Sequence, residues 1–205
     1  MNKTIGKIGA AVTGFGVLLF AILLVMGLFF NTLFACCLVC MFIAIGFIPF
    51  MVSLFSFNES SDTRAAGLSG IAFAVIYAVL ILLVYYAECT TIRLNQNLSQ
   101  ETLSIISYSH IGSLFFNYDL LGYGFMGLST FFIGFTIILQ DRADKVLRRL
   151  LWIHGVFFLS CFVLPMFPVF VAGTSDVPGT ILLLVWCAYF LPICILGYRY
   201  ISKKR

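Results

Sequence analysis

Six long apolar stretches dominate this chain, and each is long enough to cross a lipid bilayer as a helix. A helix rises about 1.5 Å per residue, so ~20 apolar residues span a hydrocarbon core of about 30 Å. With 62% hydrophobic and 10% charged residues, a water-soluble domain could not bury this much apolar surface. We therefore predict an all-α fold, a polytopic integral membrane bundle of six transmembrane helices. The expected spans are 8–30, 33–55, 66–86, 120–139, 151–171 and 178–200.

Six spans leave no room in the chain for a separate soluble domain, so residues 1–205 are expected to form a single transmembrane domain. The positions of the basic residues predict how this domain is oriented in the membrane. With six crossings, Arg93 alone of the 12 Lys and Arg residues falls on one side, and the other eleven fall on the opposite side. Because basic residues are retained in the cytoplasm, this split predicts a multi-pass protein of the cell membrane with both termini cytoplasmic. An odd number of spans would mix the charges between the two sides.

Composition and motifs argue against several classes of function. The basic residues flank apolar stretches instead of alternating with aromatic residues, so no nucleic-acid binding is expected. Most of the 7 cysteines lie inside apolar stretches, where Cys behaves as a small hydrophobe, and there are only two histidines. We therefore expect no metal site and no cofactor. The chain also has no H-E-x-x-H, G-x-S-x-G or Walker A motif, which argues against the enzymes that depend on them.

The segment 85–123 departs from the plain apolar pattern. It begins where the third stretch leaves the membrane, and by the charge count it lies on the outer side. Its polar residues alternate with hydrophobic ones that need cover from water. We expect the third helix to extend to about residue 98. A short interfacial or re-entrant helix over 99–116 is then expected between helices 3 and 4.

This segment supplies the candidate ligand-binding residues. Glu88 and Arg93 lie about 140° apart on an α-helix, so each needs a partner from another element. We expect Arg93 to meet Asp119 and Glu88 to meet His110, which would close a polar pocket near the outer leaflet. The alternative is that the charges lie at the headgroup level beside an aromatic belt of tyrosines. The candidate residues are Tyr85, Glu88, Arg93, His110, Asn117, Asp119 and Tyr123.

Three functions are compatible with this pattern. The first is binding or transport of a small molecule or lipid through the polar pocket. The second is a structural or regulatory subunit that docks a protein partner through small-residue helix faces, namely Gly6, Ala10 and Gly14 or Gly127, Thr130 and Gly134. The third is a membrane-embedded enzyme acting on a lipid-like substrate with Glu88, Asp119 and His110. Catalytic residues cannot be assigned beyond this set.

A basic cluster before the fifth stretch is expected to face the bilayer surface. Four positive charges fall within eight residues there, on the side predicted to be cytoplasmic. Anionic headgroups attract such clusters. The lipid bilayer is thus the expected partner of Arg142, Lys145, Arg148 and Arg149.

Overall fold

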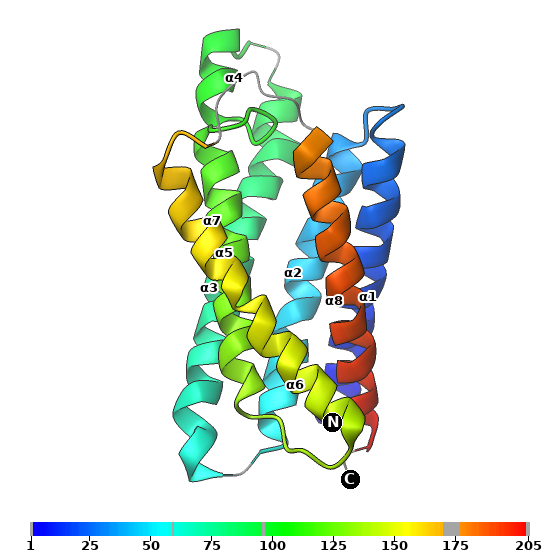
Figure 1. Cartoon of the computed structure of the whole chain (residues 1–205). Coiled ribbons are helices and arrows are strands. Elements are labelled where there is room, and N and C mark those ends of the chain that lie inside the picture. The colour runs from blue at the N-terminus through cyan, green and yellow to red at the C-terminus, as the bar shows by residue number, and fades with distance from the viewer. Residues whose placement is uncertain (1, 59, 96, 170–176, 204–205) are drawn as a thin grey trace.

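The computed structural model is helical throughout the residues it describes, which are 2–58, 60–95, 97–169 and 177–203. Figure 1 shows the α-helices: α1 (Asn2–Met26), α2 (Leu33–Ser56), α3 (Arg64–Ala87), α4 (Gln100–Ile106), α5 (Leu114–Gly134), α6 (Arg142–His154), α7 (Val156–Val163) and α8 (Val177–Lys203). Three short turns accompany them: η1 (Ser61–Thr63), the π-helical η2 (Glu88–Ile92) and η3 (Leu164–Met166). No strand occurs in the described residues.

Several of these helices are compatible with a multi-pass membrane protein. Five segments are long and apolar enough to cross a bilayer: Asn2–Met26, Leu33–Ser56, Ser61–Ile92, Arg142–Met166 and Pro178–Lys203. α5 is not among these candidates. Its 21 residues include Asn117, Asp119 and four glycines, which lower its hydropathy. The all-helical prediction is confirmed, whereas the sixth span stays a prediction.

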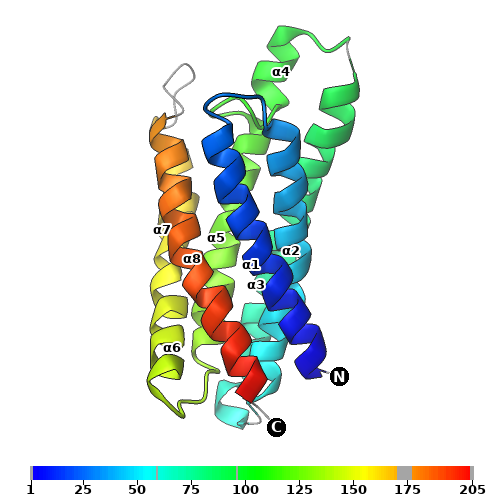
Figure 2. The ribbon, with the colours of Figure 1, turned by 90° about the vertical axis from the view of Figure 1, so that its right-hand side faces the viewer.

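The long helices pack side by side in a closed ring. α1 contacts α2, α2 contacts α3, and α3 contacts α5. α5 contacts α6 and α7, α6 contacts α8, and α8 returns to α1. Figures 1 and 2 place both termini at one end of the ring, and α4, the α1–α2 turn and the start of α8 at the other. We call this second end the distal end.

Buried aromatic residues fill the ring over much of its length. Phe47, Tyr77 and Phe190 have no exposed surface, and Trp186 is 4% exposed. Phe47 packs edge-on against Tyr77, with ring centroids 5.2 Å apart, and Trp186 stacks on Phe190 at the same spacing. Phe47 also contacts Phe190, with ring centroids 6.3 Å apart, so side chains of α2, α3 and α8 meet inside the ring, and the interior away from the distal end is a packed core.

The two predicted small-residue faces contact helices of the same chain. A Cβ on Gly6 would lie 2.3 Å from the Ser53 side chain on α2, and one on Gly14 would lie 3.2 Å from Cys194 on α8. A Cβ on Gly127 would lie 3.1 Å from the backbone at the end of α6. Small residues here let neighbouring helices of the bundle approach closely.

The predicted interfacial helix between helices 3 and 4 does not form as one unit. The helical stretch does continue past residue 86: α3 ends at Ala87, η2 follows it, and the stretch ends at Leu94. A single helix over 99–116 is interrupted because Gly112 (φ 83°) turns the chain and the Ser113 side chain caps α5. The 7-residue α4 and a loop over 107–113 take its place. α5 consequently starts six residues before the predicted span.

The fifth span was predicted to start at residue 151. The charged segment ahead of it is also helical, because α6 begins at Arg142. Asp141 caps α6 by accepting the Asp144 N–H at 3.0 Å, and Asp144 accepts the Asp141 N–H in return. Both carboxylates also bind α8. Lys203 Nζ lies 2.9 Å from Asp141 and 2.7 Å from Asp144, and Arg199 lies 3.2 Å from Asp141. These ion pairs close the ring at the end that holds the termini.

Candidate functional site

Glu88 fixes a loop over the distal end of the ring. It is the first residue of η2 and only 5% of it is exposed. Its Oε1 accepts hydrogen bonds from the Ser107 hydroxyl, at 3.0 Å, and from the Tyr108 N–H. On the other side of the loop, Asn117 Nδ2 donates to a loop carbonyl at 3.2 Å. The loop over 107–113 is therefore held between the end of α3 and the start of α5.

Serine hydroxyls shape this loop and lead to His110. Ser113 donates to the Ser107 carbonyl at 2.6 Å, and the hydroxyls of Ser107 and Ser109 lie 2.9 Å apart. Ser109 Oγ is in turn 3.3 Å from His110 Nδ1. The predicted meeting of Glu88 and His110 is thus indirect, because two serine hydroxyls lie between them.

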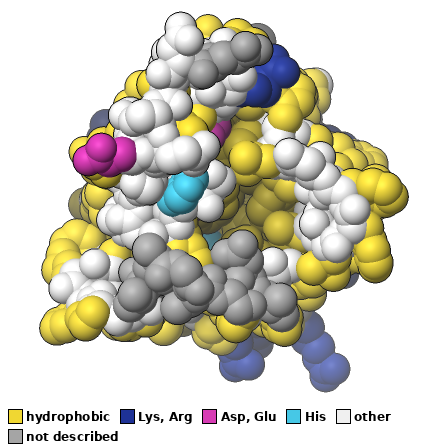
Figure 3. Space-filling view, turned by 90° about the horizontal axis from the view of Figure 1, so that it is seen from above, with side chains coloured by type: hydrophobic (Ala, Val, Ile, Leu, Met, Phe, Trp, Pro, Cys, Tyr) yellow, Lys and Arg dark blue, Asp and Glu magenta, His cyan; other side chains and the backbone are white. Residues whose placement is uncertain are grey.

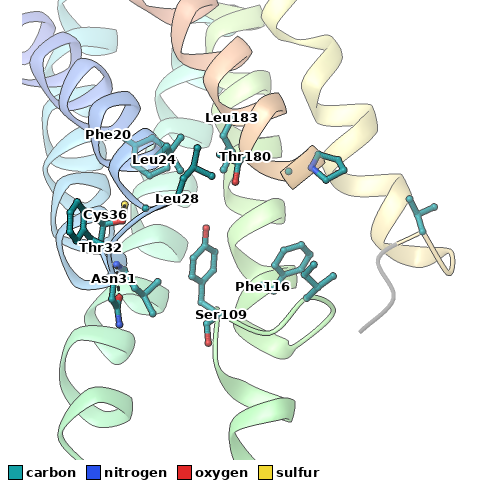
Figure 4. A pocket seen from close by; sticks show the side chains of 18 residues that line it. Phe20, Leu24, Leu28, Asn31, Thr32, Cys36, Ser109, Phe116, Thr180 and Leu183 are labelled. Carbon is teal, nitrogen blue, oxygen red and sulfur yellow. Dashed lines mark hydrogen bonds between the residues drawn. The ribbon is translucent and has the colours of Figure 1, made fainter. Parts of the chain in front are cut away.

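A cavity of about 680 Å³ opens inside the ring at the distal end. Its wall comes from α1, the α1–α2 turn, the 107–113 loop and the starts of α5 and α8 (Figure 4). Figure 3 shows the hollow from above, bordered by hydrophobic side chains. Most of the wall is apolar, with Asn31, Thr32, Tyr108 and Ser109 among its polar members. Small-molecule sites in proteins have this size and this mixture of groups.

A second, smaller cavity of about 250 Å³ adjoins the first. The start of α2, η2 with the following Arg93, and α4 with its loop line it. It brings together three of the predicted residues, Glu88, Arg93 and His110. The two cavities share Asn31 and Ser109 in their walls, together with Leu33. The distal end thus has a large, mostly apolar cavity beside a smaller one that is bordered by the charged residues Glu88 and Arg93.

Arg93 does not pair with Asp119 as predicted. Its Nε donates to the Cys89 carbonyl at 3.1 Å, and its guanidinium lies 4.5 Å from the centre of the Phe34 ring. The ion pairs found in the described part of the chain are all at the opposite end. Arg93 is separated from Asp119 because Asp119 is buried within the ring while Arg93 is exposed beyond it.

Asp119 lies with two predicted tyrosines in the interior below the cavities. It is 6% exposed, and its carboxyl group faces the hydroxyl of Tyr85. Its Oδ1 has no hydrogen-bond partner among the described residues. Tyr85 packs edge-on against Tyr108 at 5.2 Å, and the Tyr123 hydroxyl lies 3.7 Å from Cys40 Sγ. Tyr85 and Tyr123 are therefore core residues and do not form an aromatic belt.

A buried polar chain around His154 joins α5, α6 and α8. Trp186 Nε1 lies 3.0 Å from His154 Nε2, and His154 Nδ1 lies 2.8 Å from Thr130 Oγ1. Because an indole N–H can only donate, Nε2 accepts and the imidazole hydrogen is on Nδ1. Thr130 then donates to the Gly127 carbonyl at 2.8 Å. Each polar group in this series of hydrogen bonds has a partner, so the series is a structural network within the core.

Sequence reasoning missed the larger cavity. Its wall combines the α1–α2 turn with the start of α8, which are some 150 residues apart in sequence and adjacent only in the folded ring. Asn31 and Thr32 stand out as the only polar residues between the first two spans. That signal marks a turn, which by itself indicates no binding.

Comparison of the chain with protein families, with curated proteins and with solved structures finds no match. The arrangement of residues at the distal end is therefore the basis for a functional hypothesis.

Proposed function

We propose that the chain crosses the cell membrane six times, with both termini in the cytoplasm. α5 is then the remaining span, because it contacts α3, α6 and α7 within the same ring. Both termini lie at one end, as an even number of crossings requires (Figure 1). The split of basic residues supports a cytoplasmic location for that end. There, the exposed Arg142, Lys145 and Arg149 on α6 would meet anionic headgroups, while Arg148 lies over the Trp152 ring at 4.8 Å.

In this orientation the distal end faces outward, and we propose that it binds a lipid-like small molecule. The observation that carries this proposal is the apolar cavity of about 680 Å³. Tightly packed helices rarely leave voids of this size, and ligand sites of about 300–1,000 Å³ are common. Leu24, Phe116 and Leu183 converge on the cavity from three helices (Figure 4). An acyl chain or similar apolar group would replace the missing contacts between them.

Binding is better supported than passage across the membrane. Below the cavity the ring is closed by the buried side chains of Phe47, Tyr77, Trp186 and Phe190. A ligand in the cavity therefore meets a packed core at its inner end. Transport would require these aromatic side chains to separate, although Phe47 of α2 contacts both Tyr77 of α3 and Phe190 of α8.

The two alternative functions receive less support. For an enzyme, Asp119 would have to reach a substrate, yet it lines neither cavity. Glu88 uses one carboxylate oxygen to hold the loop. For a partner subunit, the small-residue faces would have to be available, yet they contact helices of the same chain. Docking of a protein partner elsewhere on the ring remains a proposal.

Lipid analysis of the purified protein tests the binding proposal. We expect a lipid-like molecule to stay with the protein after mild detergent extraction, at about one per chain, detected by native mass spectrometry. Leu183→Trp places an indole ring in the cavity and should lower the amount of this adduct while the protein stays folded. Leu182→Trp is the matched control, because Leu182 is 61% exposed on the outer surface of the same helix. Equal lipid occupancy in the two variants would contradict the proposal.

A further inference from the structure

Two opposite charges line the smaller cavity without pairing with each other. Glu88 Oε1 accepts both hydrogen bonds from the loop, which leaves Oε2 with no partner among the described residues. Arg93 uses only Nε, bonded to the Cys89 carbonyl, so Nη1 and Nη2 likewise lack partners in the described part of the chain. The cavity therefore has one carboxylate oxygen and one guanidinium edge still available for hydrogen bonds.

The π-helical turn explains how these two residues reach one cavity. In an α-helix, positions 88 and 93 lie about 140° apart. In η2, the Arg93 N–H bonds to the Glu88 carbonyl, five residues back. This wider turn brings Arg93 over Glu88, so that both side chains line the same space. π-Turns are rare and frequently occur at functional sites.

From this arrangement we infer that the smaller cavity binds a zwitterionic group with an ammonium and a phosphate or carboxylate. The ammonium would donate to Glu88 Oε2, and the anion would accept from the Arg93 guanidinium, whose planar fork suits such oxygens. A purely anionic group would meet the Glu88 carboxylate at close range. A purely cationic one would leave Arg93 without a counter-charge. Only a group that carries both charges satisfies both side chains.

The position of the smaller cavity makes a lipid headgroup the favoured source of this zwitterion. Asn31, Leu33 and Ser109 border both cavities, so a headgroup in the small one can have its chain in the large one. The stacking of Arg93 over Phe34 holds its guanidinium in place for this purpose. This inference rests on the proposed binding of a lipid-like molecule. It adds the chemistry of the headgroup and the residues that recognise it.

Four amphiphiles with apolar chains of the same length test the inference on the full-length protein in detergent. They are lysophosphatidylethanolamine (both charges), lysophosphatidic acid (anion only), an alkylammonium (cation only) and a monoacylglycerol (neutral). We expect the zwitterion to bind about tenfold more tightly than either singly charged probe, measured by native mass spectrometry. Equal binding of all four would overturn the inference and leave the proposed function standing. Absence of binding for all four, the neutral probe included, would contradict the proposed function itself.

Two variants test which side chain recognises which charge of the zwitterion. Arg93→Gln should abolish the preference of the zwitterion over the alkylammonium, and Glu88→Gln should abolish its preference over lysophosphatidic acid. Glu88→Gln keeps an amide oxygen for Ser107 and Tyr108, so the loop stays docked. Arg142→Gln at the opposite end is the control and should change neither preference. Preferences that stay unchanged in both site variants would overturn the inference.

Free phosphoethanolamine distinguishes a lipid from a soluble zwitterion. We expect it to compete with lysophosphatidylethanolamine only at concentrations at least about a hundredfold higher, because it lacks the apolar chain. Competition at equal concentration would overturn the lipid source of the headgroup.

Discussion

The Ser107 hydroxyl donates to Glu88 Oε1 over 3.0 Å and thereby ties the 107–113 loop to the end of α3. The loop borders both cavities, since Tyr108 and Ser109 line the larger one and Ser109 and His110 line the smaller. A single buried carboxylate thus positions much of the candidate site. The same residue lines the smaller cavity, so Glu88 both holds the loop in place and borders the space beside it.

Removal of the Glu88 carboxylate should release the loop. Glu88→Ala leaves the Ser107 hydroxyl and the Tyr108 N–H without their acceptor, at a cost of about 1–3 kcal/mol for each buried group left unpaired. We expect faster hydrogen exchange at the amides of 107–113 and little change in α1. Glu88→Gln retains an acceptor and should exchange at nearly the native rate. An alanine variant with native exchange in the loop would show that Glu88 does not anchor it.

The two tryptophans should differ in their contribution to stability. Trp186→Phe leaves His154 Nε2 without its donor in the core, which should destabilise the protein by about 1–3 kcal/mol. Trp152 Nε1 has no hydrogen-bond partner among the described residues, so Trp152→Phe loses no such bond and is the matched control. Thermal unfolding in detergent measures both. Equal losses of stability would mean that the Trp186–His154 bond contributes nothing.

Close packing of α1 on α2 should make Gly9 intolerant of a side chain. A Cβ there would lie 2.7 Å from the backbone nitrogen of Phe50 and 2.8 Å from the Gly46 carbonyl oxygen, and backbone atoms cannot rotate away. We expect Gly9→Ala to lower stability by about 1–3 kcal/mol. At Gly179 a Cβ meets nothing within 4 Å, so Gly179→Ala should be neutral or stabilising. The prediction fails if both variants unfold at the same temperature.

The ion pairs at the end that holds the termini should make stability depend on acid pH. The hydrogen bond from Lys203, with the Asp144 N–H and Arg199, lowers the pKa of Asp141 to about 2, below the ~3.9 of an unfolded chain. The contribution of the ionised carboxylate is therefore complete above about pH 4 and is lost as the pH falls towards 2.

Asp141→Asn isolates this effect, because asparagine still caps a helix but carries no charge. We expect the unfolding temperature of the variant to fall less steeply than that of the native protein between pH 4 and pH 2. Asp62→Asn is the control, since Asp62 is exposed and forms no ion pair within the described residues. Identical pH profiles for native protein and Asp141→Asn would refute the role of the ion pairs.

Helix content was predictable, because apolar stretches of about 20 residues have few other outcomes. The places where the helices are interrupted were harder to predict. The sequence indicates that Glu88 and Arg93 are unusual, but periodicity assumes an α-helix and places them on different faces. The π-turn that unites them is a departure from that period. The position of Gly112 likewise decides where α5 begins, since a positive φ there ends the preceding segment.

The larger cavity could not be predicted, because it depends on which helices become neighbours. Closure of the ring by contact between α1 and α8 brings Leu24 and Leu183 to one space. No local pattern in either segment encodes that contact. The burial of Asp119 is a similar case, since its neighbours Tyr85 and Cys40 come from α3 and α2.

A structure determined in a lipid bilayer tests the central claim most directly, by the density in the cavity at the distal end. Binding of a lipid-like molecule predicts elongated density between Leu24, Phe116 and Leu183, with its polar end towards Glu88 and Arg93. A cavity that contains only water, or that is closed by the protein's own side chains in the bilayer, would contradict the claim.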